Sequence, residues 1–280
     1  MELSESTLEK IKKLKEKYET MGQDLDSYLD GLLFANPIRY WDYIKVDTLL
    51  SLQQPETDFP DEEIFIMYHQ ITELYFKLVL HEMDQLSKNG KKISDEGQDM
   101  GYYKELGTKL FIERLKRINN YFKALTSSFG LMIQGMEKEQ FLKFRMSLLP
   151  ASWFQSAQYR LIEIATTDLI NIVQKDVREQ LKNKSIDEQL EKLYWKQGAT
   201  ELESGKKTLT LLQFEEKYMD TFLSYARQYQ DKNMWQKFLT ISKDDDHYQD
   251  LKKEMRELDV NVNINWPLVH YKSAVRYLQQ

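Results

Sequence analysis

This chain of 280 residues contains four histidines and no cysteine. Histidine both binds metals and transfers protons, so these four residues are the first candidates for chemistry. The absence of cysteine excludes disulfides, thiolate-ligated haem, iron–sulfur clusters and cysteine nucleophiles. None of His69, His81, His247 and His270 belongs to an HExxH pair or to another paired metal spacing, so a zinc hydrolase is not expected. We interpret His81 as a polar residue on an exposed or partly buried turn, and His247, in KDDDHYQD, as a solvated residue.

The other two histidines stand in more apolar sequence. In DEEIFIMYHQITELYFKL, Asp61 opens an amphipathic helix whose apolar residues cover a wide arc, so we expect this helix to be buried. His69 lies in its middle, one turn after Phe65. Pro267 suits the first turn of a second helix, which would carry His270. Each imidazole is either a hydrogen-bonded core residue or a functional group, for His270 an axial ligand of haem. The pattern alone leaves both hypotheses open.

Arg145 is the third candidate, because it is flanked by apolar residues in QFLKFRMSLLPASWFQS. An arginine in this setting either extends its charged end to the surface or forms a buried cation that requires an anion. Its planar guanidinium can bind a carboxylate through two parallel hydrogen bonds. The residues themselves favour neither hypothesis.

The composition limits the class of protein. A net charge of −6 and a pI near 5.5 argue against a nucleic-acid partner. No run of about 18 apolar residues is present, and the charged amino terminus does not resemble a secretory signal. We therefore expect a soluble cytoplasmic protein that does not cross a membrane. Only 10 glycines and 5 prolines occur, and there is no alternation of strands and helices, so the predicted fold class is all-α.

The elements that must position these residues follow from apolar periodicity and capping residues. We predict one domain over residues 1–280, in which the polar segment 183–210, interrupted by Gly198 and Gly205, is a possible surface insertion. A helix with Ser4 or Ser6 as its cap begins the chain. The predicted helices cover residues 4–20, 41–53, 61 to beyond 78, 103–127, one or two segments within 131–150, 156–181, 211–240 and 246–258.

Three segments of the chain resemble the tryptophan 2,3-dioxygenase family. They are YWDYIKVDTLLSLQQP with DEEIFIMYHQITELYFKLVLHEM, then FRMSLLPASWFQSAQYRLIE, then WPLVHYKSAVRYL, and they occur in the family's order. The resemblance implies an all-α haem-binding domain of the tryptophan and indoleamine dioxygenase type. It also implies an oxidoreductase of tryptophan catabolism that uses haem b with ferrous iron. In the kynurenine pathway, such an enzyme opens the indole C2–C3 bond of L-tryptophan with O2 and forms N-formylkynurenine.

The resemblance also implies roles for single residues. His270 matches the proximal histidine that ligates the haem iron, and His69 matches the distal histidine that hydrogen-bonds the indole nitrogen. We expect His69 to orient the substrate rather than to act as an obligatory base. Phe65 matches an aromatic residue of the indole pocket. Arg145 matches the arginine that pairs with the substrate carboxylate.

An amino-terminal segment is expected to complete the substrate site of a neighbouring subunit. Tyr43, with Tyr40 and Ile44 nearby, matches the segment that reaches into a second subunit's site in the family. The resemblance therefore implies a homo-oligomer, commonly a homotetramer built as a dimer of dimers.

Three features depart from the family pattern. Phe141 stands where a tyrosine is expected, and Trp153 stands where a small glycine is usual. The sequence ends at Gln280, before the family's glycine-rich loop that contacts the substrate ammonium and carboxylate, so we expect a truncated carboxyl terminus. Trp153 and the missing loop leave open a relative that acts on another indole or inserts one oxygen atom. A further alternative is a haem-binding sensor or a helical interaction protein without catalysis, and the presence of both His69 and Arg145 argues against it.

Overall fold

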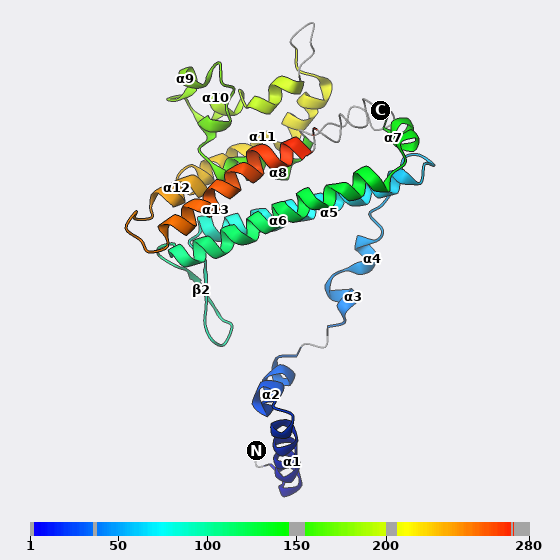
Figure 1. Ribbon diagram of the computed structural model, residues 1–280, viewed down its shortest axis with the longest axis vertical. Helices are drawn as coiled ribbons and strands as arrows, with labels where there is room; N and C mark the ends of the chain where they lie inside the picture. The colour runs from blue at the N-terminus through cyan, green and yellow to red at the C-terminus, as the bar shows by residue number, and fades with distance from the viewer. Residues whose placement is uncertain (1–2, 36–37, 146–154, 200–205, 270, 272–280) are drawn as a thin grey trace. The chain divides into compact units, whose positions relative to one another are not determined.

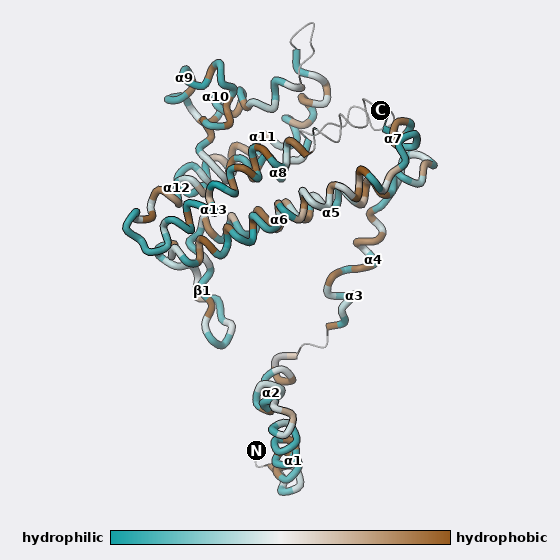
Figure 2. The backbone as a smooth tube through the Cα atoms, in the orientation of Figure 1, coloured by the Kyte–Doolittle hydropathy of each residue, from teal (hydrophilic) through white to brown (hydrophobic). Residues whose placement is uncertain are grey.

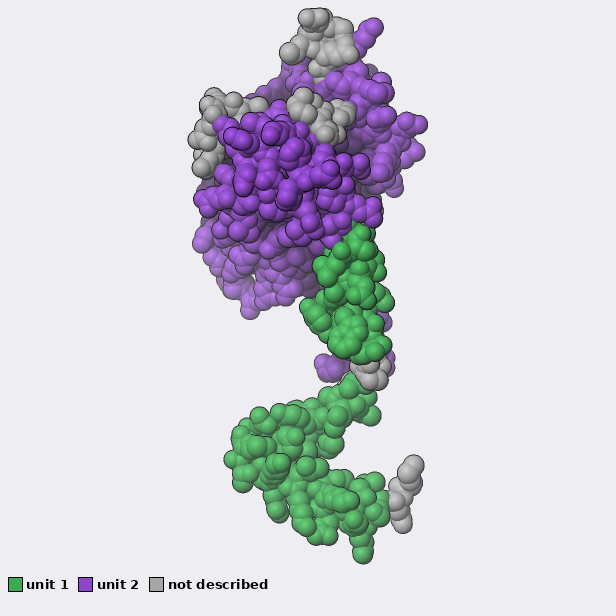
Figure 3. Space-filling model, turned by 90° about the vertical axis from the view of Figure 1, so that its right-hand side faces the viewer, with its two compact units in different colours: residues 1–52 green, residues 53–280 purple. Residues whose placement is uncertain are grey.

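The computed structural model describes residues 3–35, 38–145, 155–199, 206–269 and 271 (Figure 1). The chain divides into two compact units, residues 1–52 and 53–280, which Figure 3 colours separately. Helices dominate the described parts of both units, so the all-α fold class is confirmed. No helix in these described ranges is both long and apolar enough to cross a membrane. The prediction of one domain over residues 1–280 stays a prediction.

The first unit consists of short helices. The Ser4 side chain accepts a hydrogen bond from the Thr7 amide at 3.2 Å, which confirms Ser4 as the first helix cap. Lys45 adopts a left-handed conformation (φ 56°) and divides the predicted helix over residues 41–53 into two single turns. The helices of this unit are α1 (Glu5–Thr20), α2 (Leu25–Phe34), α3 (Tyr40–Tyr43) and α4 (Val46–Leu49).

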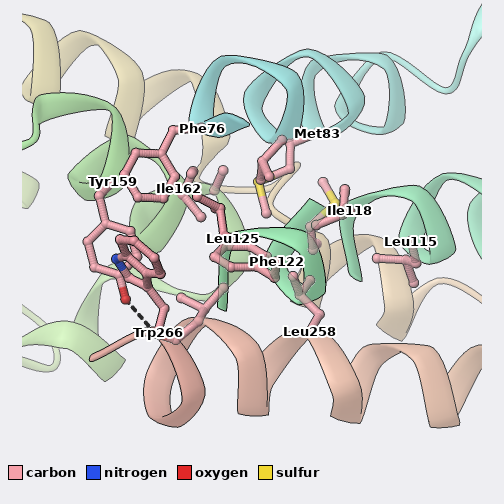
Figure 4. Close-up of a cluster of buried hydrophobic side chains, with 14 of the residues drawn as sticks. Phe76, Met83, Leu115, Ile118, Phe122, Leu125, Tyr159, Ile162, Leu258 and Trp266 are labelled. Carbon is pink, nitrogen blue, oxygen red and sulfur yellow. Dashed lines mark hydrogen bonds between the residues drawn. The ribbon is translucent and has the colours of Figure 1, made fainter. Parts of the chain in front are cut away.

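The second unit is built on the helix pair α5 (Asp61–Ser87) and α6 (Thr108–Gly135), against which α13 (Tyr248–Val260) packs. Hydrophobic residues recur along all three helices (Figure 2), as amphipathic helices around one core require. The core includes Phe76 and Met83 of α5, Phe122 and Leu125 of α6 and Leu258 of α13 (Figure 4).

The predicted burial of α5 over a wide arc is wrong for one side of the helix. Its buried side contains Tyr68, Phe76 and Met83, whereas Ile71 and Leu78 are 48% and 44% exposed. Helix α5 packs mainly against α6 and against the helix that begins at Ala157, and its apolar arc is wider than the surface that the described helices cover.

The predicted long helix over residues 156–181 is interrupted. Helix α8 (Ala157–Thr166) ends where Thr167 becomes extended, and the short elements η2 (Leu169–Ile172) and α9 (Arg178–Leu181) follow. The Asp168 carboxylate accepts hydrogen bonds at 2.9 Å from the side chains of Asn233 and Gln236. These distant partners hold Asp168 outside a helix, to which Asp is in any case poorly suited.

The segment predicted as a polar excursion, residues 183–210, contributes to a second hydrophobic cluster in its described part. Leu190, Leu193 and Trp195 are almost completely buried there against α11. The elements are α10 (Ile186–Leu190), η3 (Tyr194–Ala199) and α11 (Leu209–Tyr229). Asn233 then caps α12 (Met234–Leu239), so the helix predicted over residues 211–240 is two helices.

A small antiparallel hairpin, β1 (Lys91–Ile93) and β2 (Asp99–Tyr102), lies between α5 and α6 in the sequence and was not among the predicted elements. Asn89 and Gly90 both adopt positive φ (66° and 86°) before β1. Asn and Gly tolerate this conformation better than other residues, so the Asn-Gly pair is the local signal for the change of direction.

The prediction that Pro267 begins a helix is wrong. Helix α13 continues without a break through a π-helical segment, η4 (Asn261–Asn265), into helical residues 266–269. Proline lacks the amide hydrogen and crowds the carbonyl four residues before it, and π-helical segments are one way in which a helix accommodates such a disturbance. Pro267 therefore lies inside a helix, immediately after a π segment.

Candidate functional site

The start of α5 fixes the short helix α7 (Lys138–Phe144). The buried Asp61 carboxylate accepts a hydrogen bond from the Glu137 amide at 2.5 Å, and the Asp61 amide donates to the Gln140 side chain at 3.3 Å. These two hydrogen bonds join residues that lie 76 and 79 positions apart in the sequence, and they hold the first turns of α5 and α7 together. The last turn of α7 and Arg145 are thereby placed beside α5.

Glu62 holds the loop that leads into α5. Its fully buried carboxylate accepts hydrogen bonds from the amides of Glu56 and Thr57 at 2.9 Å each, and from the Thr57 hydroxyl. Burial by itself raises the pKa of Glu62, but these three hydrogen bonds outweigh it and lower the pKa below its usual value. The sequence suggested only a favourable helix dipole at these acidic residues, and their role as anchors of neighbouring segments was missed.

Four aromatic rings from α5 and α7 form a cluster. The rings of Phe65 and His69, one helical turn apart, lie 4.0 Å apart between centroids. Phe144 approaches Phe65 edge-on at 5.7 Å, and Phe141 lies 6.2 Å from Phe65. The structure therefore brings two predicted site residues, Phe65 and His69, together with Phe141 and Phe144, which lie four positions and one position before Arg145.

The hydrogen bond of His69 determines its tautomer. Nδ1 lies 2.7 Å from the carbonyl oxygen of Phe65, and a carbonyl only accepts, so Nδ1 carries the proton. Burial lowers the pKa of His69, against smaller opposing effects of this hydrogen bond and of Glu73, so the ring is neutral near pH 7. In a neutral ring with Nδ1 protonated, Nε2 bears a lone pair and accepts a hydrogen bond.

Arg145 ends α7 next to this cluster. Its amide donates to the Phe141 carbonyl at 3.0 Å, and its side chain is half-buried. Within the described ranges, no carboxylate of the protein forms an ion pair with Arg145. A half-buried guanidinium without an internal anion is suited to bind an external carboxylate.

The remaining predicted site residues belong to the other unit or lie outside the described residues. Tyr40, Tyr43 and Ile44 belong to the first unit, where they are 70%, 73% and 38% exposed. His270 and Trp153 lie outside the described residues. The roles assigned to all five stay predictions.

An aromatic chain joins the surroundings of His69 to the residues that precede His270. Phe129 of α6 lies edge-on to Tyr68 at 5.7 Å and to Trp266 at 5.8 Å. Trp266 also meets Phe76 of α5 at 5.4 Å. Tyr68, next to His69, and Trp266, four positions before His270, thus pack on the ring of Phe129. Helix α5 and the helix that contains residues 266–269 therefore share one core.

The donor set indicates which kind of metal group this site can hold. Among the described residues, no three His, Asp or Glu side chains lie close enough to coordinate one metal ion. The cluster instead combines a single neutral imidazole with aromatic walls. A planar cofactor that supplies most of its own metal ligands suits such surroundings better than a bare ion does.

In the part of the chain that the structure describes, two adjoining helices of a helical protein bring together aromatic rings, one hydrogen-bond acceptor and one cation without a carboxylate partner, a combination suited to a flat, partly polar molecule. The tryptophan 2,3-dioxygenase family model matches residues 33–272, and the chain belongs to this family.

Individual relatives match about half of this chain. They include tryptophan 2,3-dioxygenases of Ruegeria sp. (strain TM1040), 35% identical, and of Pseudomonas fluorescens, 33% identical, which match 46% and 49% of this chain. Tryptophan 2,3-dioxygenase 2 of Ralstonia nicotianae is 40% identical over 46% of this chain. The matched segments cover 42%, 43% and 34% of these relatives' own lengths, respectively.

Proposed function

We propose that this chain acts as a haem-dependent tryptophan 2,3-dioxygenase, which opens the indole C2–C3 bond of L-tryptophan with O2 to give N-formylkynurenine. The observation that carries the proposal is the His69 tautomer. An acceptor nitrogen lies against a phenylalanine ring, and the adjoining helix ends in an arginine that no described carboxylate pairs with. These groups match three parts of tryptophan: indole N–H, indole face and carboxylate.

His69 orients the indole. Its Nε2 lone pair accepts the indole N–H, while the hydrogen bond from Nδ1 to Phe65 holds the ring in place. The indole nitrogen is a very weak acid, and burial makes His69 a weaker base than usual. Positioning of the substrate is therefore the better role for His69 than removal of its proton.

Phe65 and Arg145 bind the two ends of the substrate. Phe65, supported from behind by Phe144, presents an apolar wall to the indole ring. Arg145 pairs with the substrate carboxylate, which replaces the anion that the described protein does not supply. The hydrogen bonds of Asp61 with Glu137 and Gln140 hold α7 against α5, so Phe65 and Arg145 stay at a fixed separation.

The proposed cofactor is haem b, and His270 is the residue that would ligate its iron. The single imidazole and the aromatic surroundings of His69 suit a porphyrin, and Phe129 joins this helix to Trp266, which precedes His270 in the sequence. When bound as ferrous haem, the cofactor supplies the binding and activation of O2. The chain's own residues supply orientation, an apolar site and the carboxylate clamp.

The proposed assembly is a homotetramer in which the segment with Tyr40, Tyr43 and Ile44 completes a neighbouring subunit's substrate site. Large exposed aromatic side chains on these short helices support the proposal, because such groups are normally covered by a partner. Light scattering on the haem-loaded protein tests it, and a monomeric mass would contradict it.

The function is tested by adding L-tryptophan to the reduced, haem-loaded protein in air. The expected product absorbs as N-formylkynurenine and is heavier than tryptophan by two oxygen atoms. His69→Phe should impair turnover, whereas His81→Phe, an exposed histidine on the same helix, is the matched control. His270→Ala should abolish the Soret band. A protein that binds haem but leaves tryptophan unchanged would contradict the proposal.

A second candidate is a relative that oxidises another indole or inserts one oxygen atom. It is favoured by Phe141, whose ring lies 6.2 Å from Phe65 and carries no hydroxyl where the family pattern has a tyrosine. The mass of the product separates the two candidates, because a single insertion adds one oxygen atom. A sensor without catalysis would bind haem and give neither product.

A further inference from the structure

The π-helical segment before Pro267 leaves one carbonyl without its backbone donor. The Trp266 amide donates to the Asn261 carbonyl, five residues earlier. In the same register, the next carbonyl, that of Val262, would accept from the amide of residue 267. Residue 267 is proline and has no amide hydrogen. Val262 is buried, and a buried carbonyl without a partner is costly, so the position requires another donor.

Tyr159 supplies that donor from a different helix. Its hydroxyl, from α8, donates to the Val262 carbonyl at 2.5 Å, and both residues are buried (Figure 4). Burial, reinforced by Glu163, raises the pKa of the Tyr159 phenol well above its usual value, so the hydroxyl remains a donor at every physiological pH. The ring packs against Phe76 of α5 at 5.4 Å, which fixes its direction.

Asparagine side chains hold the same segment from α6. Asn261 donates to Asn119 of α6 at 3.1 Å, and Asn265 donates to Asn261 at 2.8 Å. Asn119 itself donates to the Glu254 side chain at 2.9 Å. The π segment is therefore fixed by polar contacts from two helices, α6 and α8, rather than by its own backbone alone.

The register of this segment decides the direction of everything after it. A π segment adds one residue to a helix, so the residues that follow are rotated by about 100° relative to an uninterrupted α-helix. His270 follows Trp266 by four positions. A change of register at Val262 would therefore rotate helical residues 266–269, which directly precede His270 in the sequence.

We propose that Tyr159 is a positioning residue for the haem ligand: its hydroxyl replaces the amide that Pro267 lacks and holds the register of helical residues 266–269, directly before His270 in the sequence. The part concerning haem rests on the proposed function. The part concerning the missing amide depends only on Tyr159, Val262 and Pro267.

A double-mutant cycle on the full chain tests the replacement of the amide. Tyr159→Phe leaves the Val262 carbonyl unpaired and should raise the unfolding equilibrium constant roughly 5- to 150-fold. Pro267→Ala restores a backbone donor to the Val262 carbonyl. In that background, Tyr159→Phe should therefore raise the unfolding equilibrium constant less than about 3-fold. Tyr229→Phe is the matched control, because this buried tyrosine of the same core packs on Tyr225 at 4.2 Å, and its effect should be equal in both backgrounds. An equal cost of Tyr159→Phe with and without Pro267→Ala would overturn the proposal.

The consequence for haem has its own readout. Tyr159→Phe should accelerate transfer of haem to a scavenging apoglobin and change the axial-ligand signature in the ferric spectrum, and Pro267→Ala should reverse both changes. If Tyr159→Phe and Pro267→Ala are coupled in stability but the rate of haem transfer and the ferric spectrum do not change, the positioning role is overturned. A wild-type protein that binds no haem would contradict the proposed function, while the stability cycle would still decide whether Tyr159 replaces the amide.

Discussion

The proposed hydrogen bond between His69 and the indole nitrogen can be tested by changing both partners. β-(3-Benzothienyl)-L-alanine has nearly the shape of tryptophan, but sulfur replaces the indole N–H, so it has nothing to donate. His69→Phe preserves an aromatic ring on Phe65 and removes the acceptor nitrogen. The four combinations of protein and ligand form a cycle that isolates this contact from the apolar binding of the ring.

The magnitude follows from the tautomer. Since Nδ1 is already bonded to the Phe65 carbonyl, the benzothienyl analogue leaves the Nε2 lone pair buried without a donor. An unsatisfied buried polar group costs about 1–3 kcal/mol. The wild-type protein should therefore bind tryptophan roughly 5- to 150-fold more tightly than the analogue. In His69→Phe the indole N–H loses its acceptor, and the preference should fall to about 2-fold or reverse.

Equilibrium titration of the haem-loaded protein, followed by calorimetry or by the Soret band, gives the four dissociation constants. Phe65→Leu is the control, because it removes the aromatic wall but not the acceptor, and should weaken both ligands by similar factors. If tryptophan keeps its full preference over the analogue in His69→Phe, Nε2 does not bind the indole nitrogen and the assigned orientation is wrong.

Three further outcomes follow from the same contacts. Because burial lowers the folded-state pKa of His69, the unfolded chain binds the proton first as pH falls. The contribution of neutral His69 to the free energy of unfolding is therefore complete above about pH 6.5 and is lost below it. In His69→Phe, the free energy of unfolding measured in urea should depend less on pH across this range. Arg145→Leu should raise KM for L-tryptophan about 10- to 150-fold while scarcely changing the binding of tryptamine, which lacks the carboxylate; equal losses for both ligands would exclude a carboxylate clamp. Glu163→Gln should destabilise the fold by about 3–5 kcal/mol in urea unfolding, because Glu163 and Arg160 form a 2.8 Å ion pair with both side chains 1% exposed; an effect as small as that of an exposed pair would contradict this.

Local patterns were sufficient to predict where two of the helices begin. The apolar repeat and the acidic first turn predicted the helix that begins at Asp61, and Ser4 capped the first helix as expected. The end of α8 could not be predicted in the same way. Its cause is the bonding of Asp168 to Asn233 and Gln236, which lie 65 and 68 positions away and form no local pattern.

The candidate site shows the same division. The spacing of Phe65 and His69 placed them on one helix face, and the structure confirms that their rings are adjacent. The position of α7 beside them depends on the Asp61 contacts with Glu137 and Gln140, which no spacing rule reveals. Each acidic residue at a helix start satisfies the dipole rule equally well, so only the tertiary structure distinguishes an anchor from a surface charge.

Pro267 was misinterpreted for a physical reason that applies beyond this chain. Proline is favoured in the first turn of a helix because it has no amide hydrogen to offer there, and the sequence alone offers no better position for it. Inside a helix the same deficiency is tolerable when another group donates to the orphaned carbonyl. Here the Tyr159 hydroxyl donates to the Val262 carbonyl, and the two residues lie 103 positions apart. The residue that makes Pro267 tolerable inside the helix is therefore on another helix, where no local sequence pattern points to it.

The relative position of the two halves of the proposed site is set by α6, which contributes none of the candidate site residues. Phe129 of α6 touches both Tyr68, beside His69, and Trp266, which precedes His270. Asn119, two turns and more before Phe129 on the same helix, holds the π segment through Asn261. Because protein interiors are close-packed, a displacement of α6 is transmitted to both helices rather than absorbed by voids. The separation between His69 and helical residues 266–269, which precede His270, is therefore determined by the core and not by the candidate site residues alone.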